Sequence, residues 1–158
     1  MFCYKISKYN PNNYNHGVYL LDEWTDFSDI GKIFNNNVFT MDEYLRVEQN
    51  YILFVMKIIS EIHLRFFIIM DLKKNDIVPW KNKQEISVVQ LKYLIQDCLR
   101  NKCWCRIQSE NFCLCFGFDF YMHMCCGICY RYVEKHCKEF SLYINEMHNQ
   151  SDSSVSCD

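Results

Sequence analysis

Cysteine is the residue type in this sequence that could do the most chemistry. The chain has 11 cysteines, and several of them stand at short spacings. Cys103-Trp104-Cys105 and Cys113-Leu114-Cys115 are C-x-C pairs, and Cys126-Gly127-Ile128-Cys129 is a C-x-x-C motif. Because thiolates bind zinc and also exchange disulfides, these spacings allow two chemistries, a structural metal site and a redox site.

The two C-x-C pairs fall on a predicted β-hairpin. A two- or four-residue loop centred on residues 109–110 places Cys105 opposite Leu114 and Cys113 opposite Arg106, so the two cysteine pairs lie on opposite faces. Structural zinc sites also favour a C-x₂₋₄-C spacing. The hairpin therefore argues against a four-cysteine zinc site.

The C-x-x-C motif follows this hairpin, whereas a redox C-x-x-C usually opens a helix within a thioredoxin-like unit. We therefore expect most of the cysteines to act as small buried hydrophobes. A structural zinc site or a redox-sensing module remains the alternative. It would use Cys103, Cys105, Cys113, Cys115, Cys126 and Cys129.

The sequence lacks the common catalytic patterns of histidine and the common phosphate-binding patterns of glycine. None of the five histidines stands in an H-E-x-x-H pattern or beside a hydroxyl nucleophile in a recognisable elbow. The four glycines have neither dinucleotide-binding nor P-loop spacing. We therefore expect that the protein is not an enzyme, that it has no catalytic or metal-ligating residues, and that it needs no cofactor.

Acidic residues concentrate between Gly17 and Asn50. This segment has a net charge of −5, and the rest of the chain has +3. The aromatic residues Trp24, Phe27 and Tyr44 lie among the acids. Such a surface suits a basic partner, because charge steers the encounter and aromatic rings supply anchors. The expected partner-binding residues are Asp22, Glu23, Trp24, Asp26, Asp29, Asp42, Glu43 and Glu48.

A plainer interpretation of the same acids is also open. Asp29, Asp42 and Glu43 fall near the starts of predicted helices, where the helix dipole favours carboxylates. In that case the segment is a solvated face with helix caps rather than an interface.

Composition places the chain among single-domain globular proteins. It has 158 residues, of which 50% are hydrophobic, and we expect one domain over 1–147 followed by a polar tail over 148–158. A net charge of −2 and a pI of about 6.2 argue against a nucleic-acid partner. No segment offers about 18 uninterrupted apolar residues, so no membrane span is expected. The first residues lack a signal-peptide pattern, which predicts a cytoplasmic protein with reduced thiols.

Hydrophobic patterning predicts the elements that position these residues. Thr40–Glu43 and Ser87–Gln90 are capping boxes. Helices are expected over 28–34, 41–63, 88–101 and 127–138. Strands are expected over 2–9, 65–72, 103–108, 111–124 and 140–147, with 65–72 as a central strand and 18–24 as a short strand or extended segment. This order predicts an α+β fold, with a mixed or mainly antiparallel sheet and helices packed on one face.

Several short strings of the chain are similar to sequences of one family. They are YKISKYNP at Tyr4–Pro11, DEWT at Asp22–Thr25, SDIG at Ser28–Gly31, TMDEYL at Thr40–Leu45 and FGFDFY at Phe116–Tyr121. From Tyr4 to about Tyr143, the chain resembles small bacterial immunity proteins, which are encoded beside polymorphic or contact-dependent growth-inhibition toxins.

The resemblance implies a cytoplasmic, non-enzymatic protein that binds its cognate toxin domain, often a nuclease, and blocks the active site. Because a nuclease must handle phosphate, such a toxin is expected to be basic around its site. The acidic segment would fit that partner.

Overall fold

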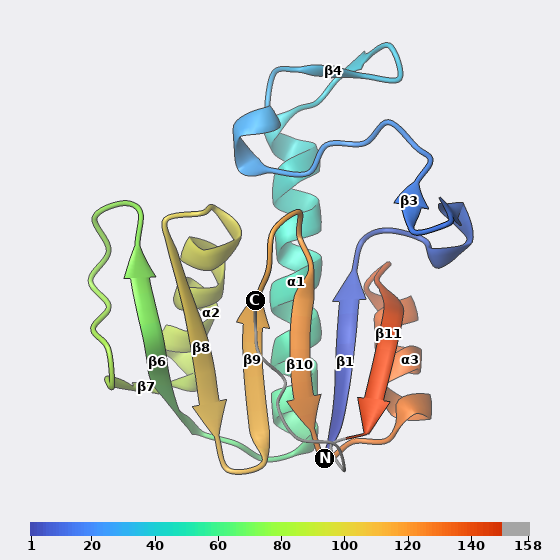
Figure 1. Ribbon diagram of the computed structural model, residues 1–158. Helices are drawn as coiled ribbons and strands as arrows, with labels where there is room; N and C mark the ends of the chain where they lie inside the picture. Colours follow the sequence, from blue (N-terminus) through green and yellow to red (C-terminus); the bar gives the residue numbers. More distant parts are fainter. Residues whose placement is uncertain (150–158) are drawn as a thin grey trace.

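A seven-stranded sheet with three helices behind it forms the protein (Figure 1), as described by a computed structural model over residues 1–149. The strand order is β11-β1-β10-β9-β8-β6-β7, and every neighbouring pair is antiparallel. The strands are β1 (Phe2–Ser7), β6 (Phe66–Lys74), β7 (Glu85–Ser87), β8 (Cys103–Ser109), β9 (Phe112–Phe116), β10 (Met122–Cys126) and β11 (Tyr143–Asn149). The helices are α1 (Met41–Glu61), α2 (Val88–Leu99) and α3 (Tyr130–Glu139). The expected α+β class is confirmed.

Local capping signals place the starts of the two longest helices. The Thr40 hydroxyl accepts the Glu43 N–H at 3.3 Å at the start of α1. Ser87 and Gln90 form a reciprocal capping box at the start of α2. Such caps satisfy N–H groups that the first helical turn leaves without partners. The α1 helix then buries an apolar stripe, which includes Tyr44, Tyr51, Phe54, Val55, Ile58 and Ile59, against the sheet.

The predicted strand over 111–124 is wrong as a single element, because the chain turns between β9 and β10. Asp119 and Phe120 adopt positive φ angles of 57° and 62° in this turn. The turn inserts the Phe120 ring into the core, at 5.1 Å from the Trp24 ring and 5.5 Å from the Tyr51 ring. Burial of this aromatic side chain therefore interrupts the expected strand.

The predicted helix over 28–34 is also wrong. A 3-10 turn covers Phe27–Asp29, and β4 (Ile33–Phe34) and β5 (Asn37–Val38) form a small hairpin. Asn35 and Asn36, between the strands, have φ angles of 48° and 64°. This left-handed pair is typical of a two-residue hairpin turn, which Asn accepts at low cost.

The strand expected at the centre, β6, lies second from the edge of the sheet. Phe67 and Ile69 are buried, while Phe66 and Ile68 are exposed. Because the described helices cover only one face of the sheet, side chains that point to the other face are not buried by a helix layer (Figure 1).

On each central strand, alternate side chains therefore point either toward the helices or toward the opposite face of the sheet. Tyr4, Ile6, Leu114, Met122 and Met124 belong to the core on the helix side. Since alternate residues point to opposite faces, the intervening residues of β1, β9 and β10 point away from the helices. They are Cys3, Lys5, Cys113, Cys115, His123 and Cys125.

The chain's C-terminal tail is expected from residue 148, but β11 continues to Asn149. The remainder, residues 150–158, lies outside the described part of the chain. Among the described residues, no helix combines the length and apolar character that crossing a membrane requires.

We predict that Tyr51→Phe lowers the free energy of unfolding by about 1–3 kcal/mol. The buried Tyr51 hydroxyl accepts the Lys8 N–H at 2.7 Å and donates to the Phe120 carbonyl at 2.7 Å, so its removal leaves two backbone groups without these partners. Urea unfolding of the variant measures the loss. Tyr93→Phe is the control, because Tyr93 is 51% exposed, and a similar small change in both variants would contradict the prediction.

Candidate functional site

A cavity of about 550 Å³ lies where the acidic segment packs on the start of α1. Its walls come from residues 22–24, the β4–β5 hairpin, the first turns of α1 and the loop before β11. Figure 1 shows this segment and hairpin at the N-terminal end of α1, beyond one end of the sheet. Four of the expected partner-binding residues line the cavity, namely Asp22, Glu23, Trp24 and Glu43.

Trp24 attaches the acidic segment to the core. Its ring stacks on Phe39 with centroids 4.3 Å apart, and only 6% of the residue is exposed. Tyr44, another of the interleaved aromatic residues, is fully buried. These rings therefore hold the segment in place, and the structure does not support the expectation that they anchor a partner.

Glu23 is engaged within the fold. One carboxylate oxygen accepts the Tyr19 hydroxyl at 3.0 Å, and the other binds the Lys8 ammonium at 3.1 Å. The Lys8 ammonium also lies 4.2 Å from the centroid of the Trp24 ring. Burial lowers the pKa of Lys8, and the adjacent Glu23 carboxylate opposes that shift. Glu23 thus balances a buried cation.

Asp26 and Asp29 shape the 3-10 turn. The Asp26 carboxylate accepts the Ser28 N–H at 2.7 Å and also binds the Asn101 side chain. Asp29 accepts the N–H groups of Thr25 and Asp26 and binds Lys32 at 2.7 Å. Burial raises the pKa of Asp29, but these hydrogen bonds outweigh it and the net pKa is lowered. Both acids cap this turn, a role that the plainer interpretation expects for Asp29 but does not assign to Asp26.

Glu48 lies inside the fold and not on the acidic surface. It is 2% exposed, and Arg100 donates to both of its carboxylate oxygens, at 2.7 and 2.8 Å. Gln96 adds a hydrogen bond at 2.9 Å. This cluster joins α1 to α2 and compensates a charge that burial alone would make costly. The expectation that Glu48 meets a partner is not supported.

The acids that remain exposed are Asp22, Asp42 and Glu43. Among the described residues, none of the three forms a salt bridge. Asp22 and Glu43 line the cavity, and Asp42 lies in the first turn of α1. These three carboxylates are the part of the acidic segment that a basic partner could reach.

Exposed apolar side chains lie in the same part of the chain, and the sequence analysis missed them. They are Val18, Leu20, Leu21, Ile33, Val38, Met41 and Leu45. Ile33 and Val38 face each other across the β4–β5 hairpin and are 67% and 57% exposed. The signal that could have found them is the Asn35-Asn36 turn, which is typical of a hairpin. Grouped exposed apolar side chains are common at protein-binding surfaces.

The sheet separates the cysteines of the alternative site into two groups. Cys103 and Cys105 lie on the helix side, where the sulfur of Cys98 is 3.9 and 3.8 Å from theirs. Cys113 and Cys115 lie on the opposite side. The expected separation of the two pairs is confirmed, although β8 and β9 pair Arg106 with Cys115, two residues along β9 from the expected partner Cys113.

The same separation bears on metal binding. Over the described residues, no group of three or more His, Cys, Asp or Glu side chains is arranged to hold a metal ion. Cys126 is buried, and Cys129 is exposed in the loop before α3. The six cysteines proposed for a zinc or redox module therefore do not come together.

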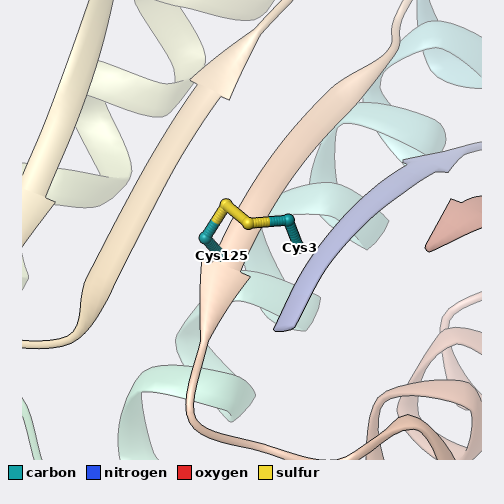
Figure 2. Close-up of a disulfide and its surroundings, with 2 residues drawn as sticks. All are labelled: Cys3 and Cys125. Atoms are coloured by element: carbon teal, nitrogen blue, oxygen red, sulfur yellow. A yellow bond between two sulfur atoms is a disulfide. The ribbon is translucent and has the colours of Figure 1, made fainter. Parts of the chain in front are cut away.

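One disulfide joins Cys3 to Cys125, which differs from the expectation of reduced thiols (Figure 2). The two residues are direct cross-strand partners on β1 and β10, with Cα atoms 4.0 Å apart. A second cavity, of about 360 Å³, lies beside this pair and is lined by Cys113, Cys115, Cys125, His123 and Arg106 among others. The sequence could not predict this pair, because 122 residues separate the cysteines.

We predict that Glu48→Ala lowers the free energy of unfolding by about 3–5 kcal/mol, because it removes one partner of a buried ion pair. Glu61→Ala is a matched control on the same helix. The Lys57–Glu61 pair is 43% exposed on both sides, so its loss should lower the free energy of unfolding far less than the loss of Glu48 does. Chemical denaturation of both variants tests this, and equal losses would show that Glu48 is not a buried structural acid.

A scan against protein-family models, a search of curated proteins and a search of solved structures each found no match.

Proposed function

We propose that the protein is a non-enzymatic immunity protein that binds and neutralises a cognate bacterial toxin domain. The binding surface comprises the exposed acids Asp22, Asp42 and Glu43 and the apolar side chains around the β4–β5 hairpin. The observation that carries the proposal is that the exposed acids Asp22 and Glu43 line one cavity together with the exposed Val38 of the β4–β5 hairpin. It is independent of the resemblance to immunity proteins.

The chemistry of the surface favours a basic protein partner. Exposed carboxylates accelerate the encounter with a basic surface, while apolar side chains supply most of the contact energy after docking. A nuclease toxin would carry cations for its phosphate substrate, and a protein that covers those cations would block the site.

The proposed binding surface is held rigidly against α1, which favours tight binding. The Trp24–Phe39 stack, the Asp26 and Asp29 caps and the Lys8–Glu23 pair hold the acidic segment against α1. A preorganised surface loses less conformational entropy on binding than a flexible one does. The internal acids therefore support the proposed surface without contacting the partner.

We predict that Asp22→Lys combined with Glu43→Lys weakens binding of the cognate toxin domain by about tenfold or more, which corresponds to ~1.4 kcal/mol. The loss should appear mainly in the association rate, and wild-type binding should weaken as salt rises, because exposed charges are screened. The measurement is the affinity for the toxin domain encoded beside this gene, together with rescue of growth when the two are co-expressed.

The control reverses the charge of two acidic residues outside the proposed surface. Glu85→Lys combined with Glu110→Lys makes the same change in charge at exposed sites beside another cavity, at the β7 edge and the β8–β9 turn. This variant should bind and rescue like the wild type. If both double variants behave alike, the proposed surface is not the binding site, and if the wild type gives no rescue, the immunity function itself fails.

A further inference from the structure

Three cysteines form a row across adjacent strands on the face of the sheet opposite the helices. The register places Cys125 of β10 opposite Cys3 of β1 on one side and opposite Cys113 of β9 on the other. Figure 2 shows the disulfide spanning β1 and β10 with helices behind the sheet. Cys125 is therefore the central residue of the row, with a cysteine neighbour on each side.

Thiol–disulfide exchange requires an attacking sulfur that can approach the disulfide from the side opposite the leaving sulfur. Direct cross-strand partners have Cα atoms about 4.5–5.5 Å apart, which is within the range that a disulfide can span. Cys113 and Cys3 lie on opposite sides of Cys125. The register thus places Cys113 where its sulfur could replace that of Cys3.

Accessibility differs along the row. Cys3 and Cys125 are 6% and 7% exposed, whereas Cys113 is partly exposed. A thiol from solution would reach a disulfide that includes Cys113 more readily than it would reach the Cys3–Cys125 bond. Transfer of the bond to Cys113 would therefore make it more reducible.

The neighbouring row carries two cations, Lys5 and Arg106. Lys5, His123, Cys115 and Arg106 are successive cross-strand partners in that row. Lys5 and Arg106 also form exposed pairs with Glu146 and Asp71. Cationic groups near a cysteine favour its thiolate, which is the attacking species. Arg106 lines the 360 Å³ cavity and could also attract the carboxylates of a small thiol. Burial and the nearby Lys5 lower the pKa of His123, so its imidazole adds no charge there at neutral pH.

We propose that the Cys3–Cys125–Cys113 row is a thiol–disulfide exchange site that accepts a low-molecular-weight, carboxylate-bearing thiol such as glutathione. The Cys113 thiolate attacks the Cys125 sulfur, the Cys113–Cys125 bond forms, and Cys3 leaves as a thiolate. The proton lost by Cys113 is regained by Cys3 through solvent, so this step needs no oxidant.

Reduction from solution completes the reaction. One glutathione thiolate attacks the Cys113–Cys125 disulfide and forms a mixed disulfide with Cys113, which releases Cys125. A second glutathione attacks the mixed disulfide and leaves as oxidised glutathione. Two electrons pass from two glutathione thiols to the protein, which ends with three reduced cysteines.

The first test is Cys3→Ser in the full chain, purified in air, alkylated and mapped by mass spectrometry without reduction. The expected result is a shift of the linkage from Cys3–Cys125 to Cys113–Cys125. Cys3→Ser combined with Cys115→Ser is the matched control and should give the same Cys113–Cys125 bond. An alkylated Cys125, or a bond from Cys125 to any other cysteine, overturns the proposal.

The second test does not depend on the folding of Cys3→Ser. Reduced glutathione is added to the wild type and to Cys113→Ser, and loss of the Cys3–Cys125 bond is followed by quenched alkylation. Because the internal attack is lost, the variant should be reduced more slowly, on the order of tenfold. Cys115→Ser should be reduced at the wild-type rate, and equal rates for the wild type and Cys113→Ser would overturn the proposal.

Discussion

The fold depends on how α1 is held against the sheet, and Tyr51 is the clearest part of that attachment. Its ring is fully buried, and its hydroxyl joins the end of β1 to the turn between β9 and β10. Burial raises the pKa of Tyr51 well above its usual value, so the hydroxyl remains a donor. Tyr44, nearer the start of α1, makes a similar attachment, because its hydroxyl donates to the Leu99 carbonyl at the end of α2.

The acidic surface follows from this attachment. The turn that Tyr51 binds delivers Phe120 to the core, and Phe120 packs against Trp24. Trp24 in turn fixes the segment that carries Asp22 beside the first turn of α1. The acidic residues thus divide into internal ones, such as Glu48 and Asp29, which stabilise the fold, and exposed ones, which are available for a partner.

The cysteines are divided by the sheet in a comparable way. On the helix side, the sulfurs of Cys98, Cys103 and Cys105 pack together in the core. On the other side, Cys3, Cys125 and Cys113 share one row with basic side chains in the next. Although cysteine density alone suggested one site, the sheet creates two environments, and the chemistry that we propose belongs to the second.

Local rules in the sequence determined the starts of α1 and α2, the α+β class and the opposite faces of the two C-x-C pairs. Capping and strand alternation act over a few residues, so they can be predicted from the sequence before the fold is known. Only the tertiary structure decided that Glu48 meets Arg100, that Trp24 is buried and that Cys3 bonds Cys125. These outcomes depend on which distant elements become neighbours, and that is set by the packing of one apolar helix layer against one face of the sheet.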